Sequence, residues 1–322
     1  MKKTIRNAIC AVIATSAVTA MAAYPEKPLT IIEPWAPGSA GDIPMRIIAE
    51  LAEKRFGQPI VVQNIQGGNG GTAQLAALKA DPDGYTVMNA WVATQVMAPI
   101  FNPNIGYTYD DFDSIVQTNA NLFMLVVRSD HPANNAQEFV QWLKDKDKKV
   151  NASVCGFTGL AHIVLRRFHE VSDTMNDFNP IPFSDCEAEN LKALLGGVTE
   201  YAITGIGAKH TFGDELKYLA LFMPERAALF PELPTAKEQG YELGLGTTGL
   251  GWSGLVVPKG LPQERLNFLR QVFDETVRSD EYINKMKSVK QTPLYGDYKE
   301  FQQLWEDTDN LLKPEILKLI KK

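Results

Sequence analysis

The stretch PWAPGSAGD, residues 34–42, is the most informative part of this sequence. It follows a β-rich run, LTII at residues 29–32, and precedes apolar residues that recur at helical spacing over residues 43–56. Asp42 is expected to be the N-cap residue of this helix, and Pro44 is tolerated in its first turn. A strand, a glycine-containing turn and a helix together predict the first unit of an α/β fold.

The same order recurs along the first part of the chain. A second strand is expected at residues 60–62, followed by the turn GGNGG at residues 67–71 and a helix that ends near Leu78. A third strand follows at residues 85–88. Strands that alternate with helices predict a mainly parallel, doubly wound sheet.

A second α/β unit repeats this scheme, with strands expected from residues 123–127 to residues 201–203. The C-terminal third is expected to be helical, over residues 264–278 and again from Tyr298, with a break at Pro314.

The length of the chain, 322 residues, exceeds one small core and suits two lobes. We expect residues 23–120 and 225–322 to form lobe 1, and residues 121–224 to form lobe 2. No low-complexity linker separates these parts of the sequence. Two lobes arranged in this way predict two chain crossings and a ligand cleft between the lobes.

The N-terminal segment begins with three basic residues and continues with an apolar run over residues 9–21, which is too short to span a bilayer. The pattern AMA at residues 20–22 completes the features of a secretory signal peptide, expected at residues 1–22. The alternative is a buried N-terminal helix. A cleaved signal peptide predicts a periplasmic protein, and no second apolar segment is long enough to insert into a membrane.

The chain is acidic, with a formal net charge of −6, and loss of the basic N-terminal segment makes it more negative. This charge argues against nucleic acid and anionic lipid as partners. It also means that any anion site must depend on local hydrogen-bond donors.

The cysteines leave two alternatives open. Cys10 lies inside the apolar run rather than at the cleavage point, so it is not expected to carry a lipid. Cys155 and Cys186 remain after cleavage, and they form either a disulfide in an oxidising compartment or two buried thiols. Their geometry decides between these alternatives.

The two glycine turns predict an anion site. Each turn opens a helix, where unpaired N–H groups and the helix dipole favour negative charge. Glycine also lets the backbone approach a ligand closely. The alternative is that both stretches are turns without a binding role.

Other site classes find little support in the sequence. The stretch GNGGTA at residues 68–73 fits a loose dinucleotide fingerprint, but the strand that follows, residues 85–89, ends without the acidic residue that holds a ribose. There is no Walker motif, and the four histidines show no metal-binding spacing. Gly251–Gly254 lacks the spacing of a nucleophile elbow. We therefore expect no cofactor, no metal and no catalytic residue, although a triad assembled in space stays open.

Several stretches, taken in order, resemble the Bug family, the periplasmic receptors of tripartite tricarboxylate transporters. They cover nearly the whole mature chain, and they are YPEKP at 24–28, PWAPGSAGD at 34–42, GQPIVVQN at 57–64, PDGYT at 82–86, LLGG at 194–197 and LPTAKEQG at 233–240.

The resemblance implies a type II periplasmic-binding-protein fold, in which two α/β lobes close on a carboxylate. Ligand contacts in this family come largely from backbone amides and waters at the first two βα turns, with a further turn from the second lobe. This sequence has Gly159 where the family usually has Ser or Thr, and Thr158 can substitute for the lost hydroxyl. It also has Asp185 where the family favours Gly, and a carboxylate there would repel an anion unless turned away or protonated.

The candidate ligand-binding residues combine these turns with nearby aromatic residues. They are Trp35, Ala36, Gly38, Ser39, Ala40, Asp42, Asn64, Gln66, Gly67, Gly68, Gly70, Gly71, Thr72, Trp91, Gly156, Phe157, Thr158, Gly159, His162, Phe183 and Asp185. Asp42 is expected to hold the helix start and the local loop rather than to contact the ligand. Trp91 and Phe157 are unusual for the family and favour a ligand with an apolar body or an aromatic ring. The alternative is that they pack in the lobe core or at the hinge.

The sequence thus predicts a monomeric, non-enzymatic solute-binding protein that delivers a small carboxylate to the membrane subunits of a tripartite transporter. Two other functions share the fold. One is a periplasmic sensor subunit that reports ligand to a membrane kinase, and the other is a periplasmic enzyme that uses the cleft. The identity of the ligand does not follow from the sequence.

Overall fold

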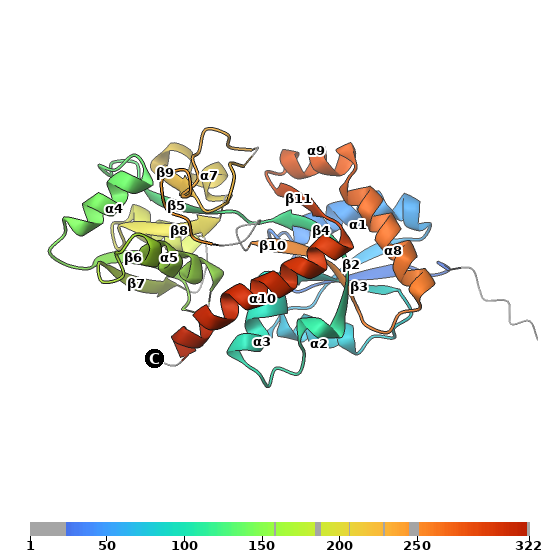
Figure 1. The fold of residues 1–322 in the computed structure, drawn as a ribbon. Helices are drawn as coiled ribbons and strands as arrows, with labels where there is room; N and C mark the ends of the chain where they lie inside the picture. Colours follow the sequence, from blue (N-terminus) through green and yellow to red (C-terminus); the bar gives the residue numbers. More distant parts are fainter. Residues whose placement is uncertain are drawn as a thin grey trace, which may run out of the picture.

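Two β-sheets, each covered by helices, organise the chain into two α/β lobes that lie side by side (Figure 1). The computed structural model describes residues 24–157, 159–183, 188–205, 207–227, 229–244 and 251–320. The predicted two-lobed α/β architecture is confirmed. Within the described residues, no helix has the length and apolar character needed to cross a membrane.

Lobe 1 contains a six-stranded sheet in the order β11-β4-β10-β3-β1-β2. β1 runs parallel to β2 and β3, whereas β10 runs antiparallel to β3 and β4. The strands are β1 (Leu29–Glu33), β2 (Ile60–Asn64), β3 (Thr86–Trp91), β4 (Phe112–Ala120), β10 (Trp252–Pro258) and β11 (Thr292–Gly296).

Lobe 2 contains a five-stranded sheet in the order β7-β6-β8-β5-β9. β6 runs parallel to β7 and β8, and β5 runs antiparallel to β8 and β9. The strands are β5 (Phe123–Arg128), β6 (Val150–Cys155), β7 (Phe178–Phe183), β8 (Tyr201–Gly205) and β9 (Leu216–Leu221).

Both sheets are mixed. β1 to β3 pair in parallel as predicted, as do β6 to β8, and every antiparallel pair among the described strands includes a strand at one of the two crossings. The chain leaves lobe 1 on β4 and enters lobe 2 on β5, then leaves lobe 2 on β9 and returns on β10. Because the outgoing and returning strands are neighbours in each sheet, each pair must run antiparallel. Where the crossings meet, the N–H of Asn121 donates to the carbonyl oxygen of Gly251 at 2.7 Å. A Cβ at Gly251 would lie 1.8 Å from the carbonyl oxygen of Asn121, so only glycine fits there.

The helices of lobe 1 cover both faces of its sheet, because alternate strand residues point to opposite sides. Ile31 and Val87 pack with one set of helices, and Ile32 and Met88 pack with the other. The first set is α1 (Asp42–Phe56), α8 (Gln263–Val277) and α9 (Asp280–Ser288). The second set is α2 (Gly71–Leu78), α3 (Ala98–Phe101) and α10 (Tyr298–Ile320).

Lobe 2 follows the same rule. Leu125 and Val127 pack with α4 (Ala136–Lys144) and α5 (Leu160–Val171), whereas Met124 and Val126 pack with α6 (Ala188–Leu195) and α7 (Gly207–Phe212). Four short helical segments complete the described part of the fold, namely η1 (Gly68–Gly70), η2 (Ala93–Met97), η3 (Tyr109–Asp111) and η4 (Gly213–Glu215).

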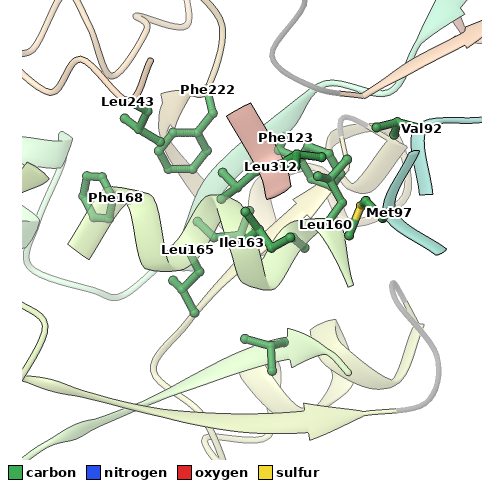
Figure 2. Close-up of a cluster of buried hydrophobic side chains, with 14 of the residues drawn as sticks. Val92, Met97, Phe123, Leu160, Ile163, Leu165, Phe168, Phe222, Leu243 and Leu312 are labelled. Atoms are coloured by element: carbon green, nitrogen blue, oxygen red, sulfur yellow. The ribbon is translucent and has the colours of Figure 1, made fainter. Parts of the chain in front are cut away.

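One cluster of buried side chains joins the lobes (Figure 2). It includes Met97 of η2 in lobe 1, Leu160 at the start of α5 in lobe 2, and Leu312 of α10. The expected break at Pro314 is wrong, since α10 continues to Ile320. Leu312 and Ile316, on either side of the proline, are both buried in this cluster, and their packing holds the helix across the missing N–H.

Candidate functional site

The first two βα turns leave lobe 1 at the same edge of the sheet. Glu33 and Asn64, the last residues of β1 and β2, are register partners. The Asn64 side chain donates from Nδ2 to the carbonyl oxygen of Trp35 at 2.7 Å. A Cβ at Gly70 would lie 2.2 Å from Cγ2 of Thr94, so the second turn packs directly against the segment that follows β3. The three connections therefore form one layer at the carboxyl ends of the parallel strands.

Asp42 holds the first turn in place. Its buried carboxylate accepts hydrogen bonds from the Gly38 N–H at 2.8 Å, from Asn64 Nδ2 at 2.8 Å, and from Arg46 Nε and Nη2 at 2.7 and 2.9 Å. Burial alone would raise the pKa of Asp42, but the bonds from Arg46, Asn64 and Gly38 lower it. The carboxylate is therefore ionised, and its charge is matched by Arg46.

The expectation that Asp42 is the N-cap of α1 was wrong by one residue. Gly41 is the N-cap, and Asp42 is the first helical residue, with its side chain folded back to Gly38. Oγ of Ser39 accepts from the Asp42 N–H at 3.3 Å, and the Ser39 carbonyl accepts from Ile43 N–H at 3.1 Å. The first helical donors are thus already used.

Free donors lie in the turn itself. The N–H groups of Ala40 and Gly41 have no hydrogen-bond acceptor within the part of the chain that the structure describes. Ala40 is exposed and Gly41 is half-buried. These two N–H groups are the donors that the first turn can offer to an anion.

The second turn has a similar character. Gly67, Gly68 and Gly70 adopt positive φ values of 123°, 56° and 88°, which favour glycine. The N–H groups of Gly70 and Thr72 donate to the Gly67 carbonyl at 3.0 and 3.4 Å. The N–H of Gly68 has no acceptor among the described residues, and Gly67 and Gly68 are exposed.

The remaining predicted residues of lobe 1 add no charge to the turns. Ala36, Gln66 and Thr72 are exposed, and Gly71 is buried. Trp91 is half-buried and packs against the cluster that joins the lobes.

In lobe 2, the turn after β6 is bonded to the end of β7, because the Gly156 N–H donates to the Phe183 carbonyl at 3.1 Å. Phe157 is 52% exposed, and Phe183 is half-buried. Gly159 is the N-cap of α5 and provides no side-chain cap. Thr158, Asp185 and Cys186 lie outside the described residues, as does the side chain of Cys155, so the disulfide stays an open alternative.

His162, in the first turn of α5, is buried and lies 5.6 Å from Phe157 between ring centroids. Burial lowers the pKa of His162, so the ring is neutral. Nδ1 lies 2.8 Å from the Phe157 carbonyl oxygen. Since a carbonyl can only accept, Nδ1 carries the proton, and Nε2 is left as a buried acceptor without a partner among the described residues.

Sequence reasoning missed a buried polar network beneath the first turn. Glu33 is fully buried, and its Oε1 accepts from the Trp35 N–H at 3.2 Å. Its Oε2 accepts from Asn89 Nδ2 at 2.7 Å, and Asn89 Oδ1 accepts from the Ser253 hydroxyl at 2.8 Å. Burial raises the pKa of Glu33 to about 7, although the bonds from Asn89 and Trp35 lower it. The available signal was an acidic residue at the end of an otherwise apolar strand.

Sequence reasoning also missed Gln95 and Thr204. Gln95 of η2 is fully buried, and neither of its amide atoms has a partner within the described chain. The hydroxyl of Thr204, near the end of β8, is likewise without a partner there. Buried polar atoms without partners are uncommon, and a water or ligand would satisfy these two residues.

A cavity of about 790 Å³ lies away from these turns and contains none of the predicted residues. Its lining comes from Leu122, residues 223–227, Leu229, the end of α8, α9 and β11. Its cations are Arg226, which is paired with Glu238, Arg278, which is paired with Asp274, and Lys287. The glycine turns, with free N–H donors next to the start of a helix, are therefore kept as the candidate anion site.

Comparison with known proteins places the chain among receptors. The family model described as "Tripartite tricarboxylate transporter family receptor" matches residues 45–320. A UPF0065 protein of Cupriavidus necator is 28% identical over 298 residues, which cover 92% of this chain and 88% of that protein. Protein BugT of Bordetella pertussis is 25% identical over 275 residues, which cover 84% and 82% of the two chains.

Solved structures share the fold. A TctC solute-binding protein from Polaromonas is 25% identical, with a TM-score of 0.79 over 92% of this chain and 99% of that one. MatC from Rhodopseudomonas palustris with bound malate has a TM-score of 0.70 at 22% identity, over 90% and 99% of the chains. A second R. palustris protein, with adipate, has a TM-score of 0.75 at 20% identity, over 90% and 96%.

The raised pKa of Glu33 predicts a pH-dependent stability. Because the folded-state pKa of about 7 exceeds the ordinary value of 4.5, the folded chain binds a proton more tightly than the unfolded chain. The free energy of unfolding of the wild type, relative to Glu33→Gln, should fall by about 3 kcal/mol as the pH rises from 4.5 to above 7. Urea unfolding at several pH values measures this difference.

Asp83→Asn is the matched control. Although burial alone would raise it, the pKa of Asp83 is lowered by hydrogen bonds from Lys27 and the Tyr85 N–H. The contribution of Asp83 to stability is therefore lost only at more acidic pH. The difference in unfolding free energy between Asp83→Asn and the wild type should stay constant between pH 4.5 and 8. A flat difference for Glu33→Gln as well would show that Glu33 titrates in its ordinary range.

Proposed function

The chain belongs to the tripartite tricarboxylate transporter receptor family, and we propose that it captures a small carboxylate in the periplasm for the membrane subunits of such a transporter. Membership confirms the resemblance to the Bug receptors and assigns a binding protein rather than an enzyme. The observation that carries the proposal is the group of free N–H donors at Ala40, Gly41 and Gly68, on turns that follow the paired strands β1 and β2.

The turns suit a carboxylate without a cationic side chain in direct contact. Backbone N–H groups that converge on an oxyanion form charge-assisted hydrogen bonds and require no rearrangement when the turn is already fixed. Asp42 fixes the first turn, and Arg46 matches its negative charge at 2.7 Å, so the pair adds little net repulsion. Relatives of this fold hold small carboxylates, malate in one and adipate in another.

The second lobe supplies apolar surface and an acceptor. Phe157 exposes about half of its ring, and Gly159 adds no hydroxyl next to it. The unprotonated Nε2 of His162 does not donate to a carboxylate. These features favour a ligand whose carboxylate lies on the turns of lobe 1 and whose apolar body faces lobe 2, with Trp91 as a further contact.

Export is the first testable part of the proposal. Residue 24 is already part of lobe 1, since the hydroxyl of Tyr24 donates to the Gly84 carbonyl at 2.7 Å and its ring packs on Tyr85 and Phe268. A cleaved signal peptide of residues 1–22 would leave these contacts intact. N-terminal sequencing of a periplasmic extract should find Ala23 or Tyr24 first. Recovery of the chain with Met1 in place would contradict export.

The ligand class is tested with a thermal-shift panel of aromatic acids, aliphatic diacids including adipate, malate and citrate. We expect acids with an apolar body to stabilise the protein most. A ligand at a hundred times its Kd adds about 2.7 kcal/mol, which shifts the melting temperature by several degrees. Stabilisation by citrate and malate alone would contradict the apolar assignment and leave the carboxylate receptor intact. No shift with any acid would contradict the receptor proposal itself.

The role of the first turn is tested with Gly38→Val, which places a bulky side chain on an exposed residue beside the free donors. Affinity for the acid that stabilises most should fall at least about tenfold, or about 1.4 kcal/mol, by calorimetry. Gly70→Val is less informative, because its Cβ would collide with Thr94.

Gly57→Val is the matched control for Gly38→Val. Gly57 ends α1 at its opposite end and has φ 84° against 79° for Gly38, and a Cβ added at either glycine would meet no atom within 4 Å. Both variants carry the same backbone strain, but only Gly38→Val should lose affinity. An equal affinity for the two variants would remove the first turn from the site.

A further inference from the structure

The Glu33 carboxyl lies directly beneath the turn that offers free donors. A Cβ at Gly41 would lie 2.9 Å from Oε1 of Glu33 and 2.7 Å from Cδ1 of Trp35. No layer of side chains therefore separates the carboxyl from the backbone of Gly41. An anion bound at the Gly41 N–H would be close to Glu33.

The charges around Glu33 leave it poorly compensated. Within the described chain, the charged groups that act on it are Asp42 and Arg46, both from α1. Arg46 already makes two hydrogen bonds to Asp42. The neutral groups against the carboxyl are the Trp35 N–H and the amide of Asn89. With a pKa raised to about 7 by burial, Glu33 exchanges its proton near neutral pH.

The hydrogen-bond partners of Glu33 are compatible with either protonation state of its carboxyl. With the carboxylate ionised, the Ser253 hydroxyl donates to Asn89, and Asn89 donates to Glu33. If Oε2 is protonated, a flip of the Asn89 amide lets Glu33 donate to Oδ1, while Nδ2 donates to the Ser253 oxygen. Because an amide and a hydroxyl can both donate and accept, each hydrogen bond from Glu33 through Asn89 to Ser253 is kept, with its direction reversed.

We propose that the Glu33 carboxyl takes up a proton from the solvent, in part of the molecules near neutral pH, when an anion binds at the first turn, and that reversal of the Asn89–Ser253 hydrogen bonds accommodates this proton. The inference rests on the proposed binding of a carboxylate at Gly41. A negative charge near an ionised carboxyl disfavours that ionised form and so raises its pKa. The proton thus removes the repulsion that the ligand would otherwise meet.

The sign of the pH dependence follows from linkage. The liganded state has the higher Glu33 pKa, so affinity is greatest at pH values where the free protein is already protonated and falls as the pH rises through about 7. A shift of about one unit on binding weakens affinity about tenfold across this range. Asn89 and Ser253 are positioning residues, since they act on the ligand only through Glu33.

The experiment uses the mature protein with adipate as the probe. Calorimetry near pH 7, in two buffers with different ionisation enthalpies, should report uptake of about half a proton per adipate bound. Glu33→Gln should bind with no uptake and with an affinity that does not change between pH 6 and 8. In Glu33→Gln with Asn89→Asp, the hydrogen bond is restored with its direction reversed, and uptake should return. Binding of adipate by the wild type without proton uptake would overturn the proposal and leave the receptor function standing.

A second arm decides the question if adipate does not bind. Ser39→Asp places a fixed carboxylate at the turn and keeps an acceptor for the Asp42 N–H, and Ser39→Asn is its neutral match. Carboxyl ¹³C NMR of labelled glutamate, with Glu33→Gln for assignment, gives the titration midpoint of Glu33 in the ligand-free protein. We expect a midpoint about one pH unit higher in Ser39→Asp than in Ser39→Asn. Equal midpoints would overturn the proposal.

Discussion

The chain must pass between the lobes twice along neighbouring paths, and this constraint determines much of the structure. β4 and β10 lie side by side in one sheet, as β5 and β9 do in the other, and each pair runs antiparallel because one strand leads out and the other leads back. The crossings are tied by the bond from Asn121 to Gly251. The cluster that includes Met97, Leu160 and Leu312 adds a buried contact between the lobes.

Within lobe 1, the proposed site depends on a turn that protein contacts already hold in place. Asp42 brings together the Gly38 backbone, Arg46 of the following helix and Asn64 of the neighbouring strand. The donors that remain at Ala40 and Gly41 are therefore held in place by protein contacts, which lowers the entropy lost on binding. The same turn lies on Glu33, whose burial gives the site a group that titrates near neutral pH.

The local features were predictable from sequence, and the long-range ones were not. Strand, glycine turn and helix follow from periodicity over a few residues, so β1, β2 and the turns after them were placed correctly. The antiparallel strands β10 and β11 were not predicted, because the strands they pair with are far away in sequence. Ser253 lies 164 residues from Asn89, so no local pattern could reveal the Glu33 network. Pro314 predicted a helix break because proline has no N–H to donate, but tertiary packing keeps α10 continuous through it.

The position of β10 between β3 and β4 also bears on the order in which the molecule assembles. The described strands of lobe 2 lie between Phe123 and Leu221, an uninterrupted piece of chain, whereas lobe 1 needs a central strand that begins at Trp252. Contacts between distant parts of a chain form more slowly than local ones, and domains fold largely as units. Lobe 2 can therefore fold as soon as its own residues emerge, while the sheet that carries the two glycine turns is completed last.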